Sequence, residues 1–167
     1  MSEPVISAAE ASEIKTDRMR FTKNTASSRL CYLAILLDVF YFVNIYESDR
    51  GSWYYSLLIG ASIVVNLLFM LYVFLASEGV KNYKSGYSIG LYLAGVFQAA
   101  RVFVIPMQAM QAQITVNGSS SAVMSPAQGA WAIGWLIGSA VCLILAGIIN
   151  QKKCVALARH AKKTEVV

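Results

Sequence analysis

After its first 28 residues the chain is dominated by long apolar stretches that short polar segments separate. The four stretches lie at about 30–46, 53–76, 86–106 and 126–149. Each is near or within the length of about 17–25 residues that a transmembrane helix needs. The pattern therefore predicts an all-α integral membrane protein, a four-helix transmembrane bundle over residues 29–149.

Local signals refine the ends of these stretches. Trp53 starts an aromatic run of the kind that sits at the membrane interface. Pro106 is expected to kink or close the third helix, with a further turn or two beyond it. Ser125, Pro126 and Gln128 fit a capping box, so a helix should begin at Pro126. Residues 77–84 are expected to form a short basic turn and 114–124 a polar, uncharged loop.

Composition and charge agree with a membrane protein. Hydrophobic residues make up 57% of the chain and charged residues 14%, and no residue from Val102 to Gln151 is charged. With four spans, every basic residue except Arg50 and Arg101 lies on the side of the two termini. The positive-inside rule then predicts an N-terminal tail (1–28) and a basic C-terminal tail (150–167) that are both cytoplasmic, most simply at the plasma membrane. Topology and lipid headgroups account for the basic charge, so no nucleic-acid partner is expected.

Polar side chains inside the apolar stretches are the first candidate site, because they are costly at membrane depth. Counting about 1.5 Å per residue from the predicted helix ends places them in two layers. Asp38 and Asn66 fall near the middle of the membrane, and Asn44, Gln98 and Arg101 fall in its outer half. They could line an ion or solute path, hold the helices together, or dock onto a partner subunit. Arg101 could pair with Asp38, or with Glu47 or Asp49 at the outer mouth.

Small residues at helical spacing form the second candidate, since they let helix backbones approach closely in lipid. They could serve packing within the bundle or a face for another subunit. The positions are Gly86 and Gly90 in the third span and Ala130, Gly134, Gly138, Cys142 and Ala146 in the fourth.

Catalytic chemistry has little support in the sequence. The three cysteines have no paired spacing, and His160, the single histidine, lies in the basic tail. We therefore expect no catalytic residue, metal or cofactor. The expected function is that of a non-enzymatic accessory or assembly subunit of a larger membrane complex, such as a transporter. Its partners would be the lipid bilayer and another membrane protein or a second copy. The alternative is a homo-oligomeric channel or small-solute or ion transporter that uses Asp38 and Arg101.

Overall fold

The computed structural model describes residues 23–46, 53–116 and 119–164. Four helical segments in this part of the chain are long and apolar enough to cross a membrane, so the fold is compatible with the predicted membrane bundle. The elements are α2 (Thr25–Tyr46), α3 (Trp53–Lys81), α4 (Gly86–Val104), α5 (Pro106–Gln111), β1 (Gln113–Val116), β2 (Ser119–Ala122) and α6 (Pro126–Thr164).

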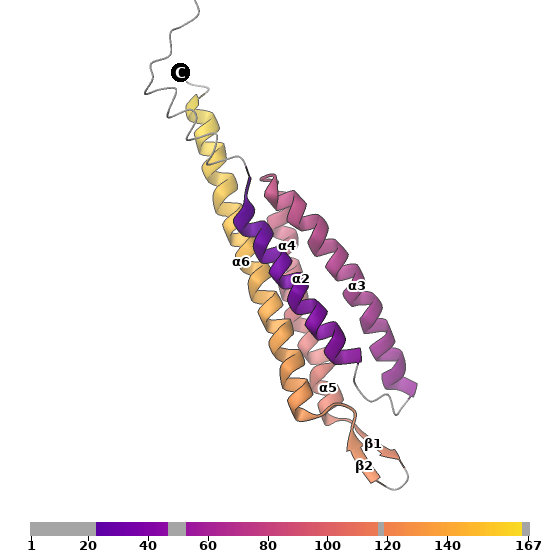
Figure 1. Ribbon diagram of the computed structural model, residues 1–167. Coiled ribbons are helices and arrows are strands. Elements are labelled where there is room, and N and C mark those ends of the chain that lie inside the picture. The colour runs from indigo at the N-terminus through magenta and orange to yellow at the C-terminus, as the bar shows by residue number, and fades with distance from the viewer. Residues whose placement is uncertain (1–22, 47–52, 117–118, 165–167) are drawn as a thin grey trace, which may run out of the picture.

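The long helices lie side by side, and α6 runs through the whole length of the bundle (Figure 1). It packs extensively against α2 and α4, whereas α3 packs mainly on α2 and touches α4 at few places. We call the end that holds Asn24, the α3–α4 turn and Asn150 the termini end, and the opposite end, with β1 and β2, the hairpin end. The weak α3–α4 contact leaves a seam along one side of the bundle.

Helix α2 begins at Thr25, earlier than the predicted start near residue 30, so the predicted tail boundary at residue 28 falls inside a helix. Asn24 is the reason. Its side-chain Oδ1 accepts a hydrogen bond from the Ser27 N–H at 3.4 Å, which caps the helix. Its Nδ2 also donates to Asn150 Oδ1 on α6 at 3.1 Å. Asn24, Ser27 and Ser28 are buried and are therefore part of the bundle.

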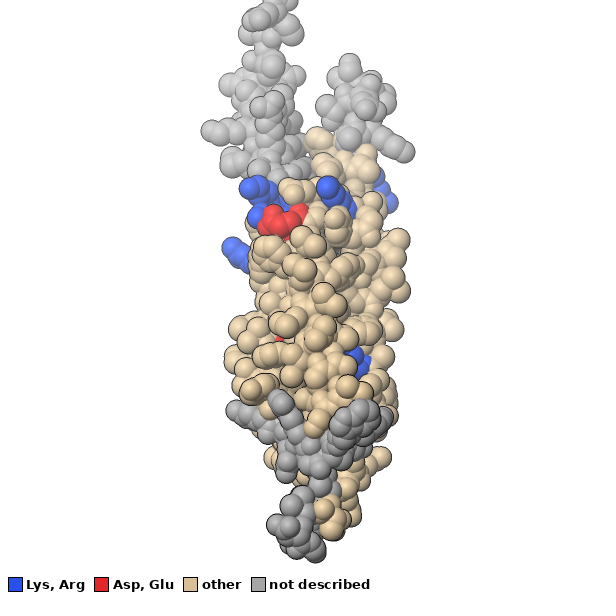
Figure 2. Space-filling view, turned by 90° about the vertical axis from the view of Figure 1, so that its right-hand side faces the viewer, with Lys and Arg blue, Asp and Glu red and all other residues tan. Residues whose placement is uncertain are grey.

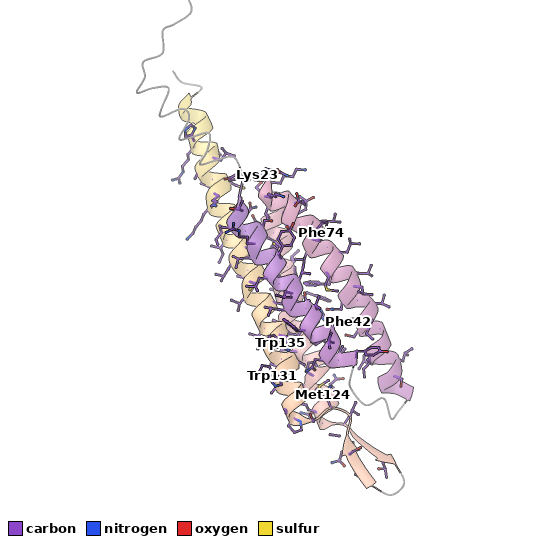
Figure 3. The ribbon with its side chains drawn as sticks, in the orientation of Figure 1. Lys23, Phe42, Phe74, Met124, Trp131 and Trp135 are labelled. Carbon is purple, nitrogen blue, oxygen red and sulfur yellow. The ribbon has the colours of Figure 1, made fainter. Side chains whose placement is uncertain are left out.

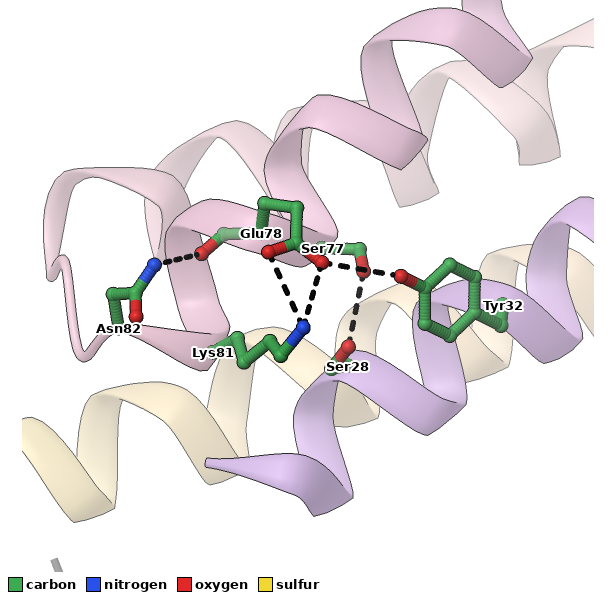
Figure 4. A network of polar contacts seen from close by, with 6 residues as sticks. All are labelled: Ser28, Tyr32, Ser77, Glu78, Lys81 and Asn82. Carbon is green, nitrogen blue, oxygen red and sulfur yellow. Dashed lines mark hydrogen bonds and ion pairs between the residues drawn. The ribbon is translucent and has the colours of Figure 1, made fainter. Parts of the chain in front are cut away.

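Helix α3 runs to Lys81, beyond the predicted end at Ala76, so the predicted turn at 77–84 is wrong in its first half. The polar residues of these last turns have partners on α2 or in their own helix (Figure 4). Ser77 and Ser28 share a hydrogen bond of 3.0 Å, and the Tyr32 hydroxyl donates to Glu78 at 3.2 Å. Lys81 pairs with Glu78 at 2.9 Å.

The turn from α3 to α4 depends on one residue in the left-handed region. Tyr83 has φ 56°, and its N–H donates to the Val80 carbonyl while the Lys84 N–H donates to the Gly79 carbonyl. These two bonds form the helix-ending Schellman motif, in which glycine usually takes the position of Tyr83. A sequence pattern search for a glycine there would miss this helix end.

Pro106 acts as predicted. Helix α4 ends at Val104, and the short helix α5 continues from Pro106 to Gln111, because proline lacks the N–H that an unbroken helix would use. The prediction of a loop at 114–124 is wrong. Strands β1 and β2 pair there as an antiparallel hairpin with Gln113 opposite Ala122. Asn117 and Gly118 lie between the strands in sequence, and an Asn-Gly pair is the usual hairpin signal.

The predicted start of the last helix is confirmed. Helix α6 begins at Pro126, and the Gln128 N–H donates to Ser125 Oγ at 3.2 Å. The Gln128 side chain donates to the Asn44 carbonyl at 2.8 Å, which ties α6 to the end of α2. The helix continues past Ile149, the predicted end of the membrane span, to Thr164, so its last turns extend past the other helices (Figure 1).

The outside of the bundle is apolar, as lipid contact requires. Large hydrophobic side chains such as Leu68, Leu93 and Trp131 are more than half exposed. In Figure 2 the Lys and Arg residues of the visible face gather mainly toward the termini end. Inside, one apolar cluster lies toward the hairpin end around Met124 and Leu136, and a second toward the termini end around Val73 and Leu143. Figure 3 shows Met124 near the hairpin and Phe74 near the other end.

Candidate functional site

Four of the five predicted intramembrane polar residues meet in the centre of the bundle. Asp38 on α2, Asn66 on α3, and Gln98 and Arg101 on α4 are all buried, with Arg101 the most exposed at 6%. Ser139 on α6, fully buried, joins them. We call these five residues the central polar network. Each of the four long helices supplies at least one member, so the network connects the whole bundle.

Gln98 is the centre of the network. Its amide nitrogen donates to Asp38 Oδ1 and, at 3.1 Å, to Ser139 Oγ. Its amide oxygen accepts from Arg101 Nη1 at 2.7 Å. The Ser139 hydroxyl also lies 3.4 Å from Asp38 Oδ2, as a donor. Both oxygens of the Asp38 carboxylate are thus satisfied by neutral side chains.

Asn66 forms the second connection between the two charged residues. Its amide nitrogen donates to the Asp38 backbone carbonyl at 3.2 Å, and its amide oxygen accepts from Arg101 Nη1 at 2.9 Å. In the described part of the chain the direct ion pair is Lys81–Glu78. Arg101 and Asp38, one of the pairings considered from the sequence, are connected through the Gln98 and Asn66 amides and not by a direct ion pair. The other possible partners, Glu47 and Asp49, lie outside the described residues.

The prediction of two polar layers is wrong for Asp38, Asn66, Gln98 and Arg101, because α2 begins earlier and α3 ends later than predicted. Measured from Thr25, Asp38 lies about 20 Å along its helix, and Gln98 lies about 18 Å from Gly86. Asn66 and Arg101 lie about 22 Å from their ends. The four therefore share one level, which allows them to bond to one another.

Arg101 also packs on aromatic rings. Its guanidinium carbon lies 4.8 Å from the centre of the Tyr41 ring and 6.0 Å from that of Phe97, distances typical of cation–π contact. The buried Tyr41 hydroxyl lies near Ser62 and Arg101, and Arg101 Nη2 is buried without a well-formed hydrogen bond to a described residue. Arg101 also lines a groove of about 230 Å³ in the α3–α4 seam, with Ser62 and Phe97.

Asn44 lies apart from the network, toward the hairpin end. It lines a second groove, of about 340 Å³, between α2 and α6, together with Phe40, Val43, Trp131 and Trp135. The two tryptophans stack with ring centres 5.5 Å apart, and Phe40 lies 5.1 Å from Trp135. The side-chain oxygen of Asn44 is buried and has no hydrogen-bond partner among the described residues.

The predicted small-residue positions divide into open and packed ones. A Cβ at Gly86 or Gly134 would meet nothing within 4 Å, and Ala130 is exposed. A Cβ at Gly90 would collide with the Tyr72 hydroxyl, and one at Gly138 would lie 3.1 Å from Leu37. Cys142 is half-buried and Ala146 is buried. On α6 the stripe of small residues is therefore open in its hairpin-end half, at Ala130 and Gly134, and packed inside the bundle in its other half. On α4 the order is different, since Gly86 is open and Gly90 is packed.

The glycines at the closest α4–α6 contacts are others. A Cβ at Gly95 would lie 2.7 Å from Ile144 and 3.1 Å from the Ala140 backbone oxygen, and one at Gly147 would lie 2.8 Å from Tyr92. Both follow a buried alanine in the tripeptide Leu-Ala-Gly, at 93–95 and 145–147. The repeated Leu-Ala-Gly tripeptide marks these close helix contacts in the sequence, whereas Gly-x-x-x-Gly spacing does not include them.

A second polar cluster, also missed from the sequence, closes the termini end. Asn150 on α6 donates to Ser88 Oγ on α4 at 2.8 Å and to the Lys84 carbonyl at 3.1 Å, and accepts from Asn24. All three side chains, of Asn24, Ser88 and Asn150, are buried. Their hydrogen bonds satisfy the polar groups, so this cluster ties helix ends together.

Catalytic geometry is not evident in the described ranges. They hold no group of three or more His, Cys, Asp or Glu side chains that could bind a metal ion. The four apolar helices indicate a multi-pass membrane protein with a polar network at its centre. No protein-family model, curated protein or solved structure matches the chain.

Proposed function

We propose that this protein is a non-enzymatic accessory or assembly subunit that docks a transmembrane helix of a larger membrane complex, such as a transporter. The observation that carries the proposal is the α2–α6 groove, whose largely aromatic walls include Asn44, a half-buried polar side chain. Lipid chains can cover these walls, but they offer Asn44 no hydrogen-bonding group. A Ser, Thr, Asn or Gln of a partner helix would bond to the Asn44 amide once that side chain turns into the groove, and such bonds join helices within membranes.

The open half of the small-residue stripe supports the same face. Gly134 follows Trp131 by three residues, so the two share one side of α6 with the groove. Nothing in the described structure approaches the Gly134 position, and Ala130 beside it is exposed. A partner backbone could therefore come close to α6 here, while the stacked tryptophans would border it.

The residues of the central polar network are buried inside the bundle and therefore do not belong to this docking face. Asp38, Asn66, Gln98 and Arg101 bond to one another inside the bundle and are at most 6% exposed. We assign them to holding the four helices in one arrangement. Asn44 is the predicted polar position that remains for a partner.

The test is a bulky residue at Gly134. Replacing Gly134 by leucine should abolish stoichiometric co-purification of a partner membrane protein in mild detergent, because the side chain fills the surface that the partner backbone would occupy. The matched control is Gly60→Leu on α3, since Gly60 is equally open and lies at a similar distance from the start of its helix. That variant should keep the partner. Retention of the partner by both variants, or its equal loss from both, would contradict the proposed face.

Orientation is part of the proposal. Apart from Arg101, the described basic residues all belong to the termini end, which we assign to the cytoplasmic side of the plasma membrane. They are Lys23, Arg29, Lys81, Lys84, Lys152, Lys153, Arg159, Lys162 and Lys163. The hairpin would then face outward.

Cysteine labelling checks this orientation. In a chain whose native cysteines are replaced by alanine, a cysteine at the exposed position Ser120 should react with an impermeant maleimide on intact cells. A cysteine at Ala158, exposed on the α6 extension, should react only after permeabilisation. The reverse result would place both termini outside.

The alternative function, a homo-oligomeric channel or small-solute or ion transporter, is favoured by a different observation. Arg101 lines the seam groove, and its Nη2 lacks a described partner. For this function the purified protein would be a lone oligomer whose liposomes leak ions. In this case Gly134→Leu should leave the ion leakage intact, whereas Ser62→Leu, in the seam, should abolish it. That result would favour the channel or transporter over the accessory subunit.

A further inference from the structure

A groove at the termini end of the bundle lies between α4 and the start of the α6 extension. Its volume is about 530 Å³. The side chains of Tyr92, Ile148, Val155 and Ala156 provide an apolar floor, and Lys152 and Arg159 are the cations on its wall. The Tyr92 hydroxyl donates to Gln151 at 2.8 Å, which fixes the two helices on either side of the groove.

The α6 residues of the groove follow helical spacing. Lys152, Val155, Ala156 and Arg159 are separated by three, one and three positions, so they form one face of the helix. This face combines two cations with two small apolar side chains between them. It is the part of the extension that turns toward α4, as its shared groove with Tyr92 requires.

The two cations have no compensating charge in the described part of the chain. The acidic residues described there are Asp38, which is buried in the central polar network, and Glu78, which pairs with Lys81. Lys152 and Arg159 take part in no described ion pair. An anion is the ligand that this wall would attract.

The height of the groove relates it to the membrane surface. Tyr92 lies about 9 Å into α4 from Gly86, at a depth that acyl chains reach. Asn150 donates to the Lys84 carbonyl in the α3–α4 turn, so Lys152 and the residues after it lie at or beyond the level where the other helices end. Tyr92 and Ile148 thus lie at acyl depth, whereas Lys152 and Arg159, with Val155 and Ala156 between them, lie at headgroup depth or beyond it.

We propose that this groove binds one phospholipid with an anionic headgroup, whose phosphate lies between Lys152 and Arg159 and whose acyl chain covers Tyr92 and Ile148. The α6 extension is then a lipid-binding element in addition to a cytoplasmic tail. The site is independent of the proposed docking face, which lies at the other end of the bundle.

Native mass spectrometry of the full chain in a neutral detergent tests the site. Titration with phosphatidylglycerol should reveal one tightly retained lipid, preferred at least tenfold over phosphatidylcholine with the same chains. The variant Lys152→Gln/Arg159→Gln should lose about 30-fold in affinity for phosphatidylglycerol, since each basic residue near an anionic lipid contributes about fivefold. Ala156→Glu should lower the affinity as well, because it adds a carboxylate to the floor.

The matched control removes the same charge elsewhere at the termini end. Lys23→Gln/Arg29→Gln lies on and before α2, where both residues are exposed, and should change the affinity less than threefold. All of these positions are exposed, so thermal unfolding of the variants should match that of the native chain. If both double variants lost the same affinity for phosphatidylglycerol, the effect would come from the total positive charge of the termini end. That result would overturn the proposed site. Equal competition by glycerol phosphate, which has no acyl chains, would overturn the lipid as its occupant.

Discussion

Replacing Arg101 by methionine is expected to lower the free energy of unfolding by about 3 kcal/mol, because it leaves a buried carboxylate uncompensated. The change also removes the donor that Asn66 and Gln98 share. Asp38→Leu should cost a similar amount, for the same reason with the charges reversed. Unfolding in mixed micelles containing increasing dodecyl sulfate, followed by circular dichroism, measures both.

The double variant Asp38→Leu/Arg101→Met separates a charged unit from a set of independent bonds. It should cost about as much as one single variant, which corresponds to a coupling of about 3 kcal/mol at the upper end of measured values. Arg29→Met, which removes an exposed arginine near the start of α2, should stay within about 0.5 kcal/mol of the native chain. Losses near 0.6 kcal/mol for each single variant, additive in the double, would instead be those of ordinary interhelical hydrogen bonds.

Gly95→Leu is the second substitution with a large expected effect. Its Cβ would lie 3.1 Å from the Ala140 backbone oxygen and 2.7 Å from Ile144. The side chain of Ile144 can rotate, but the Ala140 carbonyl can move only if α4 and α6 separate along their whole contact. We expect a loss of up to about 3 kcal/mol, the upper range for overpacked cores.

Two leucine variants at open glycines provide the comparison. A Cβ at Gly60 or Gly134 meets nothing within 4 Å. Leucine is a better helix former than glycine by up to about 1 kcal/mol, so these variants should be as stable as the native chain or more stable. The same unfolding measurement applies. If Gly134→Leu destabilised the isolated protein as much as Gly95→Leu, Gly134 would pack within the bundle. It could then not belong to the docking face.

The helices themselves could be read from the sequence because membrane insertion constrains composition so strongly. Length and hydropathy located all four apolar helices. Local chemistry also placed two of their ends, at Pro106 and at Ser125, where backbone geometry and capping act within a few residues. The helix ends at Thr25 and Lys81 differ from the predicted ones because polar side chains there find partners on another helix. Helix α6 also runs past its predicted end near Ile149, as an extension beyond the other helices.

The candidate site divides in the same way. Asp38, Asn66, Gln98 and Arg101 stood out because polar groups are rare within apolar stretches. Ser139 did not, since a lone serine in a transmembrane helix is common and only its neighbours give it a role. Which glycines permit close packing was also undecided, because Gly95 and Gly134 have the same side chain and differ only in what faces them.

For this protein, the sequence by itself determined that four helices can cross a membrane and which of their residues are costly there, since both follow from the chemistry of single positions in lipid. The tertiary structure alone decided that four of those costly residues form one network with Ser139. It also decided that the side-chain oxygen of Asn44 has no described hydrogen-bond partner and that α6 presents a basic groove beside α4. The reason is physical: the rotation and relative height of packed helices depend on contacts between residues far apart in the chain, and no local pattern records them.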